Sequence, residues 1–187
     1  MSDMIQPKTV NPALVELQSS EPLSVVQLGL VADEIAESLR QYRPEFSLLI
    51  RLHRRSGCRE MELFQPSRWH AVSTSMVKVQ PQKGNAVRSL LFADIGFADA
   101  AAFSVVLTDM GRLPYRQYER AFSDVVREKS LWRLYDNGFA PPCTHLFRHV
   151  RIKELAAQGM EKSSIASWIG EKNEQNLDYY LNSRYYI

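Results

Sequence analysis

Two histidines bracket an arginine in the segment THLFRHVRIKEL, residues 144–155, which otherwise has an amphipathic helical pattern. His145 and Arg148 are three positions apart, so on a helix both side chains leave the same face and can reach one ligand. An imidazole supplies a hydrogen-bond donor, and a guanidinium supplies a fixed, permanently charged fork. This combination suits a phosphate oxyanion better than a neutral group. The segment therefore predicts an anion site near the start of a helix.

A second concentration of positive charge lies earlier in the chain, at Arg51, Arg54, Arg55 and Arg59. The ordinary explanation of such a run is a solvated helix face. The whole chain of 187 residues has a net charge of only +2, so a generally cationic surface is not available for binding nucleic acid. Any basic face must be local.

Apolar spacings of three and four, broken by proline and glycine, predict helical segments over residues 24–40, 46–55, 58–63, 98–106, 115–129, 144–159, 161–169 and 177–180. Thr144 is the expected N-cap of the helix that carries the two histidines. Two β-branched or apolar runs, 76–79 and 87–92, flank the sequence QPQKGN, whose glycine and asparagine tolerate the positive φ of a hairpin turn. Lys83 is therefore expected at or beside a hairpin tip.

The C-terminal part of this pattern resembles the tyrosine recombinase, or phage integrase, family. HLFRH, a helix ending at glycine, and then WIGE resemble that family's HxxRH and LGH motifs, with a tyrosine nine residues after the last motif position. The matching residues here are His145, Arg148, Glu171 and Tyr180.

The resemblance extends upstream. SGCREMEL, residues 56–63, resembles the family's TGLRxSEL motif, which puts Arg59 in the arginine position and Glu62 in that of the supporting acid. QKGN resembles the turn KGNKxR that carries the family's catalytic lysine, which puts Lys83 in the lysine position.

Over roughly residues 22–182 the resemblance implies an α+β, mainly helical fold with a small antiparallel three-stranded sheet. We expect residues 1–21 to be a flexible arm and residues 22–187 to be the catalytic domain, without the N-terminal core-binding domain that many family members carry. The implied function is site-specific DNA recombination of the integrase, invertase or resolvase type, through a 3′-phosphotyrosyl intermediate.

The resemblance also implies roles for the matched residues. Tyr180 would attack phosphorus, and Arg59 and Arg148 would stabilise the charge that builds up on the phosphate oxygens. Lys83 would protonate the departing 5′ oxygen, and His145 would donate to the phosphate or shuttle a proton near it.

Glu62 is expected to be a buried acid that orients Arg59. Further DNA contacts are expected from Arg54, Arg55, Arg88, His149 and Arg151.

Position 171 departs from the family pattern. The family usually has His or Trp there, which donates a hydrogen bond to the phosphate, whereas an ionised carboxylate accepts and repels an anion. Glu171 is therefore protonated, or turned away with Lys172 or Trp168 compensating, or cleavage is impaired. Tyr179 is a rival nucleophile, although the spacing favours Tyr180.

Two alternative functions stay open: a catalytically impaired DNA-binding regulator of a mobile element or plasmid, and a relaxase-like enzyme that nicks one strand with the same tyrosine. The expected partners are double-stranded DNA, further copies of the chain in a dimer or tetramer on DNA, and an accessory DNA-binding protein.

No cofactor is implied. His145, His149 and Cys143 lack the further ligands and spacing of a zinc site. Two cysteines and the lack of an apolar span or signal sequence favour a cytoplasmic protein without membrane contact, of bacterial, phage or plasmid origin.

Overall fold

The computed structural model describes residues 22–81, 86–128 and 145–185 of the chain. The expected arm at residues 1–21, the hairpin tip with Lys83 and the expected cap at Thr144 lie outside the described residues. None of the helices in the described ranges is long and apolar enough to cross a membrane.

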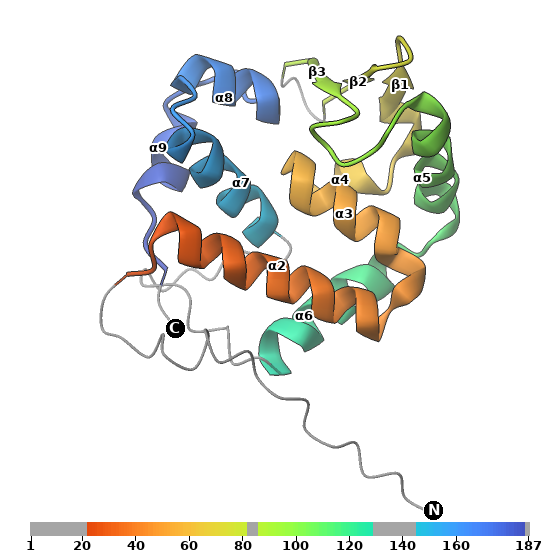
Figure 1. Ribbon diagram of the computed structural model, residues 1–187, viewed down its shortest axis with the longest axis horizontal. Coiled ribbons are helices and arrows are strands. Elements are labelled where there is room, and N and C mark those ends of the chain that lie inside the picture. The colour runs from red at the N-terminus through yellow and green to blue at the C-terminus, as the bar shows by residue number, and fades with distance from the viewer. Residues whose placement is uncertain (1–21, 82–85, 129–144, 186–187) are drawn as a thin grey trace, which may run out of the picture.

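The described segments form a mainly helical fold with one small sheet (Figure 1). The helices are α2 (Val25–Tyr42), α3 (Ser47–Ser56), α4 (Glu60–Leu63), α5 (Ala100–Arg112), α6 (Tyr115–Glu128), α7 (Leu146–Ala157), α8 (Lys162–Ile169) and α9 (Asn176–Asn182). Short 3-10 helices cover Pro44–Phe46 and Pro66–Arg68, and the strands are β1 (Trp69–Ala71), β2 (Met76–Val79) and β3 (Arg88–Leu91). The helical segments predicted from the sequence within these ranges are confirmed, although α5 runs past the predicted residue 106.

Helix α2 illustrates how the sequence sets these bounds. Ser24 caps it, since its hydroxyl accepts from the backbone N–H of Gln27 while the Gln27 side chain accepts from the backbone of Ser24. Along the helix, the apolar residues spaced by three and four are buried, among them Leu28, Val31 and Ile35. The helix therefore presents one apolar face to the rest of the molecule.

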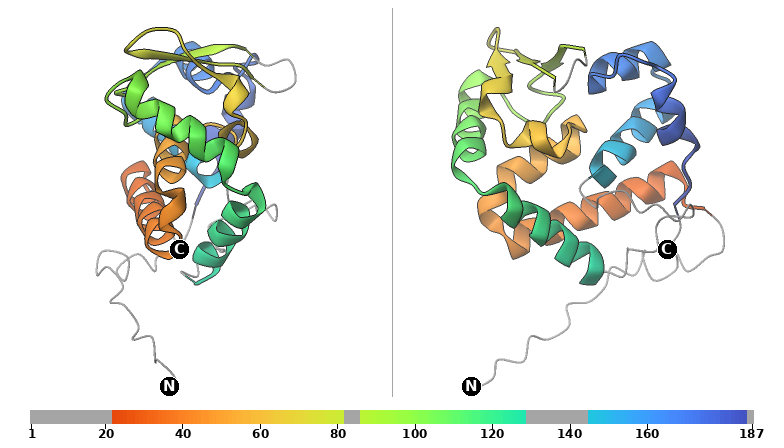
Figure 2. Two further views of the ribbon diagram at one scale, coloured as in Figure 1. Left: turned by 90° about the vertical axis from the view of Figure 1, so that its right-hand side faces the viewer. Right: turned by 180° about the vertical axis from the view of Figure 1, so that it is seen from behind.

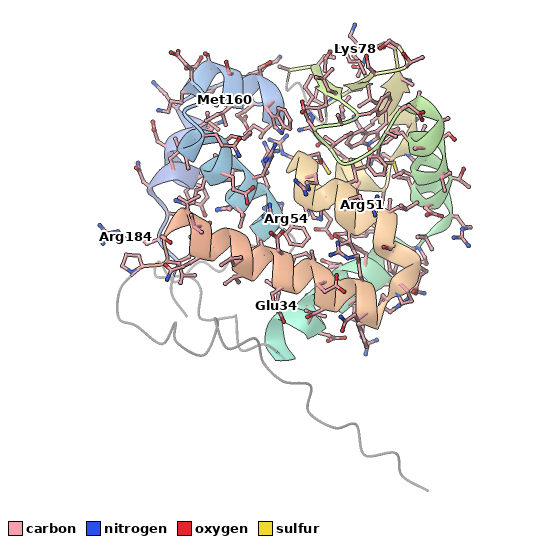
Figure 3. All side chains as sticks on the ribbon, viewed as in Figure 1. Glu34, Arg51, Arg54, Lys78, Met160 and Arg184 are labelled. Atoms are coloured by element: carbon pink, nitrogen blue, oxygen red, sulfur yellow. The ribbon has the colours of Figure 1, made fainter. Side chains whose placement is uncertain are left out.

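The three strands pair antiparallel in the order β1-β2-β3. Val77 stands opposite Ala71 on one side and Leu90 on the other. Val77, Val79 and Leu90 are buried, while Lys78 between the two valines points to solvent, as the two-residue alternation of a strand requires. Figure 3 shows Lys78 at the outer edge of the molecule.

Helices α2, α3 and α7 pack against one another, and the remaining elements surround them. In Figures 1 and 2 the sheet and α5 lie on one side of α3, whereas α8 and α9 lie on the opposite side, beside α7. The main core spans α2, α3, the sheet, α5, α6 and the first turns of α7. A smaller core of Ile152, Leu155, Ile165, Ala166, Ile169 and Leu177 joins α7, α8 and α9. Trp168 packs against both cores and so connects them.

Candidate active site

The site begins at the turn after α3, where Gly57 adopts φ +60°. A Cβ at this position would lie 3.0 Å from Cβ of Arg151 and 3.6 Å from Cα of Arg148. Glycine is thus needed both for the left-handed backbone and for the close approach of α7. After this turn, Arg59 adopts an extended conformation just before α4, and its charge acts on Arg148 in the first turn of α7.

Arg148, in the first turn of α7, is 1% exposed and is among the largest fully buried side chains of the described residues. Its Nη1 donates to the carbonyl oxygens of Gly57 at 3.0 Å and of Ile169 at 3.2 Å. Two backbone carbonyls, one from the end of α3 and one from the end of α8, therefore fix the guanidinium. Its Nε and Nη2 have no acceptor in hydrogen-bonding geometry within the described ranges.

Glu171 lies between the two arginines and is not turned away. Its Oε2 is 2.9 Å from Nη2 of Arg59 and 3.6 Å from Nη2 of Arg148. Its Oε1 accepts from the side-chain amide of Asn176 at 3.2 Å, at the start of α9. A single carboxylate thus marks the point at which both guanidinium groups can bind one anion.

Glu62 and Arg88 form a second, deeper ion pair, with Oε2 and Nη2 2.7 Å apart and each side chain 2% exposed. The same carboxylate oxygen accepts from the backbone N–H of Arg59 at 3.0 Å, whereas the nearest approach to the Arg59 guanidinium is 3.8 Å. Glu62 therefore fixes the backbone of Arg59 more closely than its side chain. Arg88 also donates to the carbonyl of Ile169 at 2.8 Å, which ties the sheet to α8.

Tyr180 lies on α9 beside Arg148. The Arg148 guanidinium carbon is 5.8 Å from the centroid of the Tyr180 ring, close enough for the phenol to act on the pKa of Arg148. The ring also packs edge-on against His149 at a centroid distance of 4.6 Å and against the smaller core. Tyr179, the rival nucleophile, is 55% exposed and also touches His149.

Burial and neighbouring positive charge shape the ionisation of the site. Burial lowers the pKa of Arg148, and the charge of Arg59 lowers it further, while Tyr180 opposes the shift. Burial also lowers the pKa of His145, again with help from Arg148 and Arg59. His145 is therefore a neutral imidazole near neutral pH, able to donate through one nitrogen and accept through the other.

The residues expected to contact DNA differ in how buried they are and in the groups that they bind within the protein. Arg88 and His149 are buried and bonded internally, so neither offers a surface to DNA in this structure. Arg54 extends from α3 toward α2, as Figure 3 shows, and pairs with Asp33 at 2.8 Å and with Glu154 at 2.5 Å. Arg55 is exposed and Arg151 is half-buried.

Three features of the site were not expected from the sequence. The first is the side-chain amide of Asn176, which donates to Glu171. The second is the carbonyl oxygen of Ile169, which accepts hydrogen bonds from both Arg88 and Arg148. The third is the buried Tyr185, whose hydroxyl is hydrogen-bonded to His149. Residue type carries no signal for a backbone acceptor, and the polar segment around Asn176 has no periodicity that would place it. In the part of the chain that the structure describes, no group of three or more His, Cys, Asp or Glu side chains could hold a metal ion.

Comparison with known proteins supports the fold. The chain matches the crystal structure of XerA recombinase with a TM-score of 0.51 and 14% sequence identity, over 80% of this chain and 57% of that one. The chain thus spans a little over half the length of the recombinase it matches. No family model matches the chain, and no curated protein matches it in sequence. The likeness bears out a mainly helical fold with a small antiparallel sheet, of the kind found in this recombinase.

Proposed function

We propose that the protein is a site-specific DNA recombinase that breaks and rejoins strands through Tyr180. The observation that carries the proposal is the shared anion position of Arg59 and Arg148, occupied by one Glu171 oxygen, with the Tyr180 ring beside Arg148. These groups come from the turn before α4, from α7, from the turn after α8 and from α9, so the fold brings together residues that span 122 positions, 59 to 180.

The chemistry assigned to this arrangement is a transesterification. The Tyr180 oxygen forms a bond to phosphorus, the bond to the 5′ oxygen breaks, and a 3′-phosphotyrosyl linkage remains. The phenol releases its proton to water, and the departing 5′ oxygen takes a proton from the ammonium group of Lys83, a role that we assign by resemblance. Two guanidinium groups fixed in advance stabilise the extra negative charge of the pentacoordinate state without reorganising.

Glu171 sets the condition for this reaction. A phosphate oxygen needs the position that Oε2 holds, so the carboxylate must move aside when DNA binds. Mutual repulsion of a carboxylate and a phosphate in a partly buried site otherwise weakens binding. DNA binding and Glu171 displacement are therefore coupled in this proposal.

The test is capture of the covalent intermediate on duplex DNA from the protein's own genomic locus, with a nick near the cleavage position so that the free end diffuses away. The expected result is a protein–DNA adduct that survives denaturing electrophoresis, is lost in Tyr180→Phe and is retained in Tyr179→Phe. Loss of the adduct in Tyr179→Phe alone would transfer the nucleophilic role to that residue.

The occupied arginine pair also favours a second candidate, a DNA-binding regulator in which Glu171 permanently replaces a phosphate. This candidate predicts that the protein binds the duplex with salt-sensitive affinity but gives no adduct with any DNA of the locus. The same experiment therefore separates the two functions.

A further inference from the structure

The segment after α9 folds back onto the body of the protein. The backbone N–H of Leu23, just before α2, donates to the carbonyl of Tyr185 at 2.7 Å. The Tyr185 side chain is 2% exposed and enters the main core, beside α7. Residues 183–185 are thus held between α7 and the start of α2.

The Tyr185 hydroxyl and Nδ1 of His149 form a hydrogen bond. His149 is 1% exposed, and burial lowers its pKa to about 3, with the nearby charges of His145, Arg148 and Lys153 acting in the same direction. Its imidazole is therefore neutral, and its tautomer decides whether Nδ1 accepts from the Tyr185 hydroxyl or donates to it. This bond fixes the orientation of the His149 ring.

The same ring supports Tyr180, which packs edge-on against it at 4.6 Å. Two further contacts connect Tyr185 with α9. Lys153 donates to the carbonyl of Leu181 at 2.8 Å while its Nζ lies 5.7 Å from the Tyr185 ring centroid. The Ser183 hydroxyl bonds the Tyr180 carbonyl at 2.7 Å and lies 3.3 Å from the Tyr185 hydroxyl oxygen.

We infer that Tyr185 is a positioning residue for the nucleophile: through His149 and the end of α9 it holds the Tyr180 ring beside Arg148. The inference rests on the proposed function for its catalytic meaning, but the mechanical connection is a property of the protein alone. α9 is short, with only seven residues, and a helix of that length has little stability of its own. Its placement therefore depends on such contacts.

The first measurement needs no DNA. In Tyr185→Phe the ring still fills its space but the hydroxyl is lost, so amide hydrogen exchange over residues 176–182 should accelerate about tenfold, while exchange in α8 stays unchanged. Tyr42→Phe, the same chemical change at a tyrosine that is 57% exposed, should leave both segments unchanged. Equal exchange of α9 in Tyr185→Phe and the wild type overturns the inference.

The second measurement follows single-turnover formation of the adduct on nicked duplex. Tyr185→Phe should slow the step about tenfold or more with unchanged affinity for the duplex, because Arg59 and Arg148 still bind phosphate while the nucleophile is misplaced. A loss of affinity with an unchanged rate contradicts a positioning role. If the wild type forms no adduct while α9 exchange still accelerates in the variant, the proposed function fails and the structural role of Tyr185 stands.

Discussion

Glu171 and Arg59 are 112 positions apart in the chain, yet they form an ion pair of 2.9 Å at the centre of the candidate site. The Glu171 side chain is 8% exposed and the Arg59 side chain is 23% exposed. Removing one member of a charge pair this protected from water costs more stability than doing so at the surface, because the remaining charge is left desolvated and unpaired. Its disruption has consequences for stability, for anion binding and for the proposed reaction, and these can be measured separately.

Replacing Glu171 with Gln removes the only acidic group within 4.0 Å of the Arg148 guanidinium in the described ranges. The free energy of unfolding should fall by about 1–3 kcal/mol, because a buried guanidinium loses its counterion while Arg59 still repels it. Inorganic phosphate at increasing concentration should then raise the melting temperature of the variant more than that of the wild type. Glu161→Gln, at an exposed position, is the control. An equal response of all three proteins to phosphate would show that the arginine pair does not bind anions.

Replacing Glu171 with His should increase adduct formation on nicked duplex by about tenfold or more. The change removes a repelling charge and supplies a hydrogen-bond donor toward the phosphate. Glu171→Ala separates the two effects, since it removes the charge and adds no donor. An unchanged rate in both variants would mean that position 171 does not face the scissile phosphate.

The Glu62–Arg88 pair should behave as a unit that supports the backbone of Arg59. Glu62→Gln and Arg88→Met should each lower the free energy of unfolding by about 3–5 kcal/mol, since each leaves one buried charge without its partner. The double variant should lose less than the sum, with a coupling of about 0.5–3 kcal/mol in urea unfolding. The same cycle at Glu37 and Arg40, a pair that is 52% and 34% exposed, should give a coupling of no more than about 0.5 kcal/mol. Strict additivity at Glu62 and Arg88 would contradict the interaction.

Stability should fall as the pH decreases below about 6.5. Burial lowers the pKa of His53 from 6.5 to about 3, with help from His145 and Arg148, and His149 behaves likewise. Between these two pKa values the unfolded chain binds protons that the folded protein does not. The contribution of these histidines to the free energy of unfolding is therefore fully present above pH 6.5 and is lost on acidification. In urea unfolding between about pH 5 and 6, His53→Phe should reduce the slope of stability against pH by about 1.4 kcal/mol per unit. An equal slope in variant and wild type would show that His53 titrates normally in the folded state.

The sequence was most informative where one periodic pattern ran over many residues. Helix α2 repeats its apolar spacing over 18 residues, and β2 alternates between the same bounds that its sequence predicts. Strand β1 has three residues, of which only Trp69 is buried, so no alternation could reveal it. A short strand is fixed by the pairing of its backbone with β2, which the local sequence does not encode.

The positions of some site residues could be predicted from the sequence, and those of others could not. The family resemblance, and no local pattern, led us to expect Arg59, Arg148 and Tyr180 near one another. In the structure Glu171 contacts both arginines, and the Tyr180 ring lies beside Arg148. The burial of Arg88 could not be predicted, because it depends on the Glu62 carboxylate 26 positions away, and arginine is otherwise expected at the surface. The direction in which Glu171 points depends on the turn after α8, where Gly170 adopts φ +71°, and on an amide five residues later.

The bond between the N–H of Leu23 and the carbonyl of Tyr185 brings the first and last described segments of the domain to one corner of the molecule. A protein fused before Leu23 and the same protein fused after Tyr185 would depart from nearly the same point, so the two fusions would have similar reach toward the arginine pair.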